Sequence, residues 1–375
     1  MPELEINILE SEIEQRKERW QQRDHFGKPD RVPVLAGIGT RYWLPIIGLS
    51  FLEYFSSPRV MFKAQLKAMK WLFEHLRDDR FQFAVFPDFQ NVREASGLGC
   101  KVVFREGFPW IEKPIIKDES DIIRIKKADM TRQGLTAKMI YFYREMKRMA
   151  KGYRIITQGG SHELEVWPGM GTDGPFTNVA WIRGPTQLLR DVMKRPEFVH
   201  ELMDIVTEKI IEFNMTLREL ACLPDDCGIG IADDFAAYLS PDHYREFVLP
   251  YHERIYKAFK TKHRSIHLCG KIDHLLEILV KEERISRLDG FGWVTNPRKL
   301  AEVMGGKVLL YGGPSPMLIK QGPRDRIMAE CRRYLEIFKP LRGYALGDGY
   351  NIPPGTPPEN INAMVEAAEI YGRYE

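Results

Sequence analysis

The chain has 375 residues, with 55 Lys or Arg and 52 Asp or Glu, so its formal net charge is +3. This balance, without a long run of one sign, argues against nucleic acid as the main partner. The sequence has neither a secretory signal at its start nor a stretch of about 18 apolar residues, so we expect no membrane association and a cytoplasmic location. Its five cysteines are scattered and odd in number, which favours reduced thiols over a disulfide framework.

The N-terminal part predicts a helix followed by a strand. Residues 3–22 are charged and carry apolar side chains roughly on one stripe, so we predict an amphipathic helix within an N-terminal helical extension, residues 1–30. The apolar residues 32–36 predict the first strand. Arg41, Tyr42 and Trp43 follow that strand, where barrel enzymes keep substrate contacts. They are candidate substrate-binding residues, although a lid loop whose aromatic rings simply pack fits them equally well.

Polar residues also follow the next two predicted strands. Residues 82–86 lead to Asp88, a candidate catalytic carboxylate that could instead cap the next turn. Residues 91–128 read as a β-rich excursion, and 154–157 as the third strand. His162 and Glu163 come after it and are candidate acid/base groups or metal ligands, with a solvated loop as the alternative for at least one of them.

The fourth predicted strand, residues 228–232, runs directly into two carboxylates. Asp233 and Asp234 repel each other at a strand end, so at least one needs a cation, a metal or a hydrogen-bond donor. We assign Asp233 to substrate binding and Asp234 to catalysis. Upstream, residues 185–222 predict two helices separated at Pro196.

The fifth predicted strand carries two metal-ligand side chains. Alternation along a strand points His267 and Cys269 in the same direction. Convergent imidazole and sulfur donors are typical of a zinc site. A core histidine beside a buried free thiol is the structural alternative. Asp348 or Tyr350, which follow the last predicted strand, could supply an oxygen as the third ligand, and we assign Asp348 to the metal and Tyr350 to substrate binding.

Eight predicted strands alternate with helices along the chain. They are residues 32–36, 82–86, 154–157, 228–232, 265–268, 288–291, 307–311 and 344–346. This pattern predicts a single α/β domain over residues 1–375, a (β/α)8 TIM barrel whose carboxyl strand ends share one cleft.

Several motifs resemble those of the uroporphyrinogen decarboxylase superfamily. They are Arg31-Val32-Pro33-Val34, Ile231-Ala232-Asp233-Asp234, Leu239-Ser240-Pro241, Tyr244-Arg245-Glu246-Phe247, Pro250-Tyr251, His267-Leu268-Cys269-Gly270 and Thr356-Pro357-Pro358-Glu359-Asn360-Ile361. The resemblance covers nearly the whole chain and implies the barrel inferred above. It also implies one of two activities: decarboxylation in tetrapyrrole synthesis, or zinc-dependent methyl transfer to or from corrinoid proteins.

The motifs resemble the methyltransferase branch more closely. The decarboxylase is expected to carry Arg-Gln-Ala-Gly-Arg-Tyr after the first strand, and only Arg41-Tyr42 of it is present here. Its Gly-His-Gly after the last strand is Gly347-Asp348-Gly349 in this chain, whereas Asp88 fits its central carboxylate. The methyltransferases share the His-X-Cys-Gly and Asp-Asp motifs. Their cysteine near the last strand is missing here, and Cys331, inside a predicted helix over 324–338, is a poor substitute.

We therefore expect a zinc-dependent methyltransferase that moves a methyl group between a small substrate, such as a methoxylated aromatic, and a corrinoid protein. The alternatives are a decarboxylase of tetrapyrrole metabolism and a non-catalytic barrel that binds a tetrapyrrole or corrinoid. The exposed faces of the 185–222 helices could support a homodimer.

Overall fold

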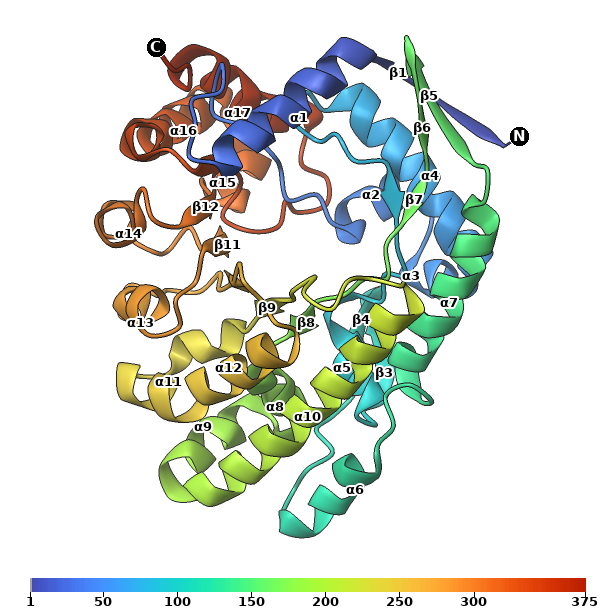
Figure 1. Cartoon of the computed structure of the whole chain (residues 1–375), viewed down its shortest axis with the longest axis vertical. Helices are drawn as coiled ribbons and strands as arrows, with labels where there is room; N and C mark the ends of the chain where they lie inside the picture. Colours follow the sequence, from blue (N-terminus) through green and yellow to red (C-terminus); the bar gives the residue numbers. More distant parts are fainter. Residues whose placement is uncertain (1) are drawn as a thin grey trace.

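Parallel strands and helices alternate around a common axis in the computed structural model, which describes residues 2–375 (Figure 1). Six strands form a continuous parallel sheet in the order β13-β12-β11-β10-β9-β8. Their bounds are β8 Thr172–Asp173, β9 Gly230–Ala232, β10 Ser265–His267, β11 Arg287–Phe291, β12 Leu309–Gly312 and β13 Tyr344–Leu346. Leu346 of β13 bridges to Val34 in parallel, and β2 (Ala84–Val85) pairs in parallel with β7 (Glu165–Val166).

The third position of the barrel is occupied by residues 165–173. This segment pairs with β2 through β7 at its start and with β9 through β8 at its end. Together with the bridged segment at Val34, the chain therefore supplies eight positions in sequence order. This is the predicted (β/α)8 barrel.

Residues 154–157 are a strand, as predicted, but not a barrel strand. They belong to β5 (Arg154–Gln158), which pairs with β1 (Glu3–Leu9) and β6 (Gly160–Glu163) in a separate three-stranded sheet. The prediction for the third barrel strand was wrong because the residue pattern of 154–157 indicates a strand but does not indicate which sheet the strand joins. The true third segment contains Pro168 and two glycines, Gly169 and Gly171, which hide it from a search for strand patterns.

The N-terminal extension is a strand followed by a helix. Residues 3–9 form β1 with Ile6 and Ile8 buried on one face, and α1 (Glu10–Asp24) begins only afterwards. The prediction of a helix from residue 3 was wrong because Leu4, Ile6 and Ile8 repeat every second residue, which is the period of a strand. Met1, also in the predicted extension, lies outside the described residues. Residues 32–36 contribute only the bridge at Val34.

Helices follow one another around the outside of the strands (Figure 1). Their bounds are α2 Thr40–Ile46, α3 Phe51–Tyr54, α4 Pro58–His75, α5 Arg93–Gly97, α6 Ile122–Lys127, α7 Gly134–Ala150, α8 Pro175–Arg183, α9 Pro185–Lys194, α10 Pro196–Leu220, α11 Pro241–Phe247, α12 Leu249–Ala258, α13 Leu276–Lys281, α14 Pro297–Met304, α15 Pro316–Gln321, α16 Arg324–Phe338 and α17 Pro358–Tyr371. The break between α9 and α10 at Pro196 is where the sequence predicts it.

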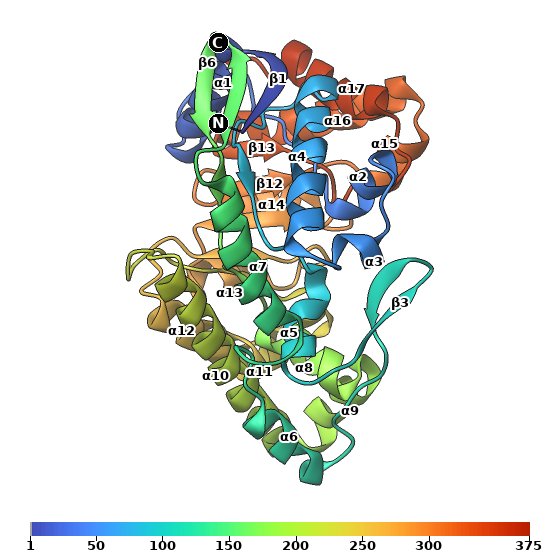
Figure 2. The same cartoon turned by 90° about the vertical axis from the view of Figure 1, so that its right-hand side faces the viewer.

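Residues 91–128 contain less strand than predicted. They hold α5, α6 and one antiparallel hairpin of β3 (Val102–Arg105) and β4 (Phe108–Ile111). The hairpin projects from the body of the molecule, and both chain termini lie at one end of the molecule's long axis (Figure 2).

Within the described part of the chain, no helix is both long enough and apolar enough to span a bilayer.

The register of the strands decides which side chains of neighbouring strands lie on the same face of the sheet. Ile231, Ile266, Leu288 and Leu310 lie side by side on adjacent strands and are almost fully buried. Burial of each such side chain stabilises the fold by roughly 1.5–3 kcal/mol. Because side chains alternate, the residues that follow these aliphatic positions point to the opposite face, among them His267 and Asp289.

Candidate functional site

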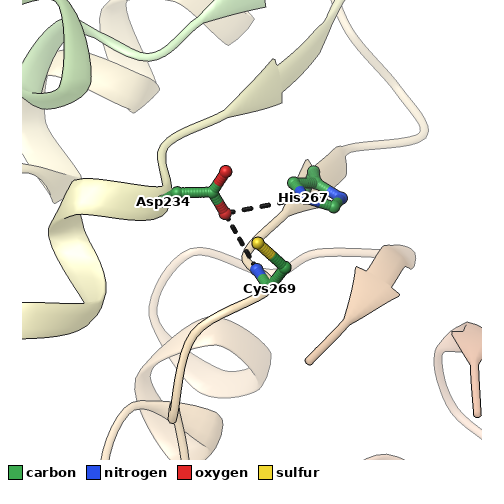
Figure 3. Close-up of side chains that lie close together, drawn as sticks. All are labelled: Asp234, His267 and Cys269. Atoms are coloured by element: carbon green, nitrogen blue, oxygen red, sulfur yellow. Dashed lines mark hydrogen bonds and ion pairs between the residues drawn. The ribbon is translucent and has the colours of Figure 1, made fainter. Parts of the chain in front are cut away.

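Three possible metal ligands converge where β9 and β10 end. Atoms of Asp234, His267 and Cys269 all lie within 4.8 Å of one another (Figure 3). His267 is the last residue of β10 and Cys269 follows two residues later, so alternation points both side chains the same way. Asp234 begins the short 3-10 helix Asp234–Tyr238, which follows β9. Parallel pairing of β9 with β10 brings the two strand ends together.

The imidazole of His267 is oriented for metal binding. Its Nδ1 is hydrogen-bonded to the carbonyl oxygen of Asp289, which leaves Nδ1 protonated and the Nε2 lone pair free. Nε2 is buried and has no hydrogen-bond partner within residues 2–375. A hydrogen-bonded Nδ1 beside an unpartnered Nε2 is the usual arrangement of a metal-binding histidine.

Asp234 contacts both other members of the cluster. Its Oδ1 lies 3.6 Å from His267 Nε2 and accepts a hydrogen bond of 2.8 Å from the backbone N–H of Cys269. Burial and the carboxylate of Asp234 raise the pKa of the Cys269 thiol. The thiol is therefore protonated when no cation is bound, and a divalent ion would offset both causes of the shift.

The donor set fits zinc. One nitrogen, one sulfur and one carboxylate oxygen are ligands that zinc accepts, and three protein ligands leave a fourth position open, as in catalytic sites. Ligand atoms around a tetrahedral zinc stand roughly 3.5 Å apart. The 3.6 Å between Asp234 Oδ1 and His267 Nε2 agrees with that spacing.

A cavity of about 340 Å³ opens beside His267. Asp88 and Tyr350, both predicted site residues, line it together with His267. The ring of Tyr350 lies 4.2 Å from the imidazole, centroid to centroid. Asp88 is already well hydrogen-bonded, because it accepts from the hydroxyl of Thr40 and from the backbone and side-chain amide nitrogens of Gln90.

The lining of this cavity also includes three charged residues that were not predicted from the sequence, Arg93, Glu94 and Asp173. Arg93 binds Glu94 at 2.8 Å and the carbonyl oxygens of Gly169 and Gly171 at 2.8 and 2.6 Å. Asp173 Oδ2 is buried and without a hydrogen-bond partner in the described chain. Burial and the nearby Glu94 raise the pKa of the Asp173 carboxyl well above its usual range. A neutral Asp173 would therefore be able to donate a hydrogen bond into the cavity.

Arg41, Tyr42 and Trp43 lie on α2, and none of them lines the cavity beside His267. Arg41 is exposed and its guanidinium stands 5.6 Å from the ring of Phe108 on the projecting hairpin. Tyr42 is buried, and its hydroxyl donates to the carbonyl oxygen of Thr356. Trp43 packs edge-on against Tyr54. The two buried rings therefore pack in the core, and Arg41 lies among surface side chains.

His162 and Glu163 lie away from the cluster, on β6 of the outer sheet. His162 Nε2 is 2.9 Å from a carboxylate oxygen of Glu10, and the Glu163 side chain is 86 % exposed. Their assignment as catalytic residues depended on residues 154–157 being a barrel strand. Because β5 pairs outside the barrel, the structure does not bring these two residues to the cleft.

Asp233 and Asp348 are both fully buried, and each is held by the chain's own donors. Asp233 accepts hydrogen bonds from the backbone of Phe176 and Thr177 at the start of α8 and contacts His252. Asp348 Oδ1 accepts the backbone N–H of Gly37 at 2.6 Å. Asp348 does not belong to the group of three converging ligand atoms, in which Asp234 supplies the oxygen instead.

The residues missed by sequence reasoning had weak local signals. Asp173 lies in the glycine-rich stretch that reads as a loop, and Arg93 with Glu94 lies in the excursion after Asp88. A charged pair five and six residues after Asp88 was the one available signal. The pairing of β2, which precedes Arg93 and Glu94, with β7, which precedes Asp173, brings the three residues to the same cavity.

Comparison with known proteins agrees with this architecture. The family model for uroporphyrinogen decarboxylase (URO-D) matches residues 25–371. The chain belongs to the uroporphyrinogen decarboxylase family. Members of this family fold as TIM barrels, so the predicted fold and superfamily are confirmed.

Curated relatives and a solved structure are similar over most of the chain. The uroporphyrinogen decarboxylase of Danio rerio is 26% identical over 345 residues, covering 87% of this chain and 84% of that protein. That of Aromatoleum aromaticum is 25% identical over 334 residues, covering 86% of each. A methyltransferase from Methanosarcina mazei matches with a TM-score of 0.70 at 21% identity, covering 95% of this chain and 98% of that one. At this identity, the structural match supports the fold alone.

Proposed function

We propose that this member of the uroporphyrinogen decarboxylase family is a zinc-dependent methyltransferase that moves a methyl group between a small substrate and a corrinoid carried by a partner protein. The observation that carries the proposal is the convergence of Asp234, His267 and Cys269, with His267 Nε2 buried and unpartnered. Decarboxylation needs no such donor set.

His267, Cys269 and Asp234 would hold the ion. When bound, zinc would serve as a Lewis acid that polarises an ether or alcohol oxygen, or lowers the pKa of a thiol, so that a methyl group can be transferred. The substrate would lie in the adjacent cavity between Tyr350 and Asp173. Asp173 Oδ2, buried and without a partner in the described chain, would bind a polar group of the substrate.

Exposed apolar side chains around the barrel mouth support transfer to a partner protein. Tyr238, Trp293 and Met317 are 72, 52 and 48 % exposed and follow the carboxyl ends of β9, β11 and β12. Large apolar side chains exposed around one opening are typical of a protein-binding surface. A partner bound there would face the cavity.

The first test is the metal content of the untagged protein, purified without chelator. We expect close to one equivalent of zinc in the wild type and at least a tenfold lower content in a His267→Ala, Cys269→Ala double variant. The matched control is His263→Ala, Cys227→Ala, which removes an exposed histidine and an exposed cysteine. Wild type with less than about a tenth of an equivalent of any divalent ion would refute the zinc site.

The second test is turnover. The metal-loaded enzyme should methylate added cob(I)alamin from a methoxylated aromatic donor, followed by the change in corrinoid absorbance. A second candidate, decarboxylation of uroporphyrinogen, is favoured by the names of the curated relatives and by Asp88 in the cavity. Carboxyl loss from uroporphyrinogen that disappears in Asp88→Asn, with no methyl transfer, would establish that candidate instead.

A further inference from the structure

Arg23 on α1 is a buried cation whose hydrogen-bonding capacity is largely unused. Its side chain is 4 % exposed, and both Nε and Nη1 are buried without a hydrogen-bond partner in residues 2–375. The guanidinium lies 4.6 Å from the ring of Trp20, a contact that satisfies none of its N–H groups. Unmade hydrogen bonds of a buried charged group are costly, so such a group is usually completed by a partner.

The surroundings of Arg23 leave it short of negative charge. Arg23 Nε forms an ion pair of 3.0 Å with Asp24 Oδ1 that does not have the geometry of a hydrogen bond, and the other oxygen of that carboxylate accepts a hydrogen bond of 3.3 Å from Arg287. Burial and the charge of Arg287 lower the pKa of Arg23 to about 10, despite the opposing effects of Asp24 and Asp289. Arg23 and Arg287 thus both contact the carboxylate of Asp24, which is itself 37 % exposed, and the charge of Asp289 does not offset the effect of burial on the pKa of Arg23.

Arg80 and Asp79, which line the same cavity as Arg23, are already paired with other groups. Arg80 makes two hydrogen bonds of 2.6 Å to Asp78. Asp79 accepts from Arg19 and Arg31 and from the backbone of Val34. They are therefore not available to neutralise Arg23.

Arg23 lines a cavity of about 620 Å³ that runs through the barrel. Arg287, at the start of β11, lines it at one end, and Tyr350 and Asn351, which follow β13, line it at the other. Phe86, Asp289 and Tyr350 line this cavity and also the one beside His267. α1 thus brings Arg23 to the amino-terminal end of the strands, opposite the Asp234 cluster.

We propose that the amino-terminal end of the barrel is an anion-binding site in which Arg23, assisted by Arg287, binds the carboxylate or phosphate group of a small molecule lying in the barrel interior. Arginine suits both groups because its planar guanidinium presents several N–H donors to paired oxygens. The aromatic lining, which includes Trp20, Phe81 and Trp167, suits an organic ligand with an apolar body. The inference concerns binding alone and does not depend on methyl transfer.

The test is calorimetric titration of the full-length protein in chloride buffer with two probes, benzoate and inorganic phosphate, and with benzamide as the uncharged control. We expect at least one anion to bind and benzamide not to bind. Binding of benzoate alone would identify a carboxylate site, and binding of phosphate alone a phosphate site. Arg23→Gln should weaken anion binding roughly tenfold or more, because a charge-assisted hydrogen bond is lost.

Two variants keep the test decisive if Arg23→Gln folds poorly. Asp24→Asn removes the carboxylate that competes for Arg23, so it should tighten anion binding severalfold, an effect that loss of structure cannot produce. Arg333→Gln, which removes a half-exposed arginine paired with Glu330 on α16, should change nothing. Failure of both anions to bind the wild type at millimolar concentration, or equal binding by wild type, Arg23→Gln and Asp24→Asn, would overturn the proposal.

Discussion

Asp234 accepts the backbone N–H of Cys269 across the gap between β9 and β10, with a donor–acceptor distance of 2.8 Å. This hydrogen bond positions the carboxylate and the sulfur together, before any ion binds. In the proposed zinc site Asp234 would therefore have two separable functions, one as a ligand and one as a positioning group for the loop that carries Cys269.

Substitution of Asp234 should separate these functions. Asp234→Asn keeps the amide acceptor Oδ1 but removes the charge, whereas Asp234→Ala removes both. We expect zinc affinity to fall at least tenfold in Asp234→Asn and further in Asp234→Ala, measured by competition with a zinc chelator. Asp242→Asn, which changes a 93 % exposed carboxylate, is the control. Unchanged affinity in Asp234→Ala would exclude Asp234 as a ligand.

Asp348 should not affect the metal. The structure buries it against the backbone N–H of Gly37, and burial raises the pKa of its carboxyl to about 6. Asp348→Asn keeps the acceptor for Gly37, so we expect wild-type zinc content by elemental analysis. A content below half that of the wild type would show instead that Asp348 ligates the ion, as the sequence alone suggests.

Gly290 leaves the space that the His267 ring occupies. It has a φ of +76°, and a Cβ at this position would lie 2.5 Å from both Nδ1 and Cε1 of His267. Gly290→Ala should therefore displace the ring and lower zinc affinity. Gly107→Ala is a matched control, because Gly107 also has a positive φ, +84°, but open space around its Cβ. Both variants should lose about 1–2 kcal/mol in free energy of unfolding from backbone strain, and only Gly290→Ala should lose metal affinity.

His252 should make stability depend on pH. Burial lowers the pKa of its imidazole, but the carboxylates of Glu283 and Asp233, each 2.9 Å from a ring nitrogen, outweigh burial and raise it to about 9 from 6.5. A raised pKa in the folded state stabilises the protein fully below the unfolded value, and this contribution is lost as the pH rises towards 9.

The measurement is urea unfolding of wild type and His252→Gln between pH 6 and pH 10. The free energy difference between the two proteins should shrink by up to about 3 kcal/mol across this range, from 1.36 kcal/mol for each pKa unit. A difference that is constant with pH would mean that the pKa of His252 is the same in the folded and the unfolded protein.

Local sequence signals determined the repeat of strand and helix and most strand positions after residue 228. Residues 265–268 are recognisable because Ile266 and Leu268 alternate with more polar residues and Gly270 follows them. The third barrel position was not recognisable, since residues 165–173 lack such a pattern and are extended only because β2 and β9 pair with them. Alternation describes a strand but does not say which sheet it joins.

The same distinction holds for the candidate site. The spacing of His267 and Cys269 already predicts that they face the same way, because they are two positions apart in an extended segment. Three other features depend on the tertiary structure. Asp234 lies beside His267 and Cys269, Asp348 accepts a hydrogen bond from Gly37 instead, and Arg23 lines the cavity in the barrel. Convergence of side chains from distant segments depends on strand pairing and helix packing, which no local pattern of residues encodes.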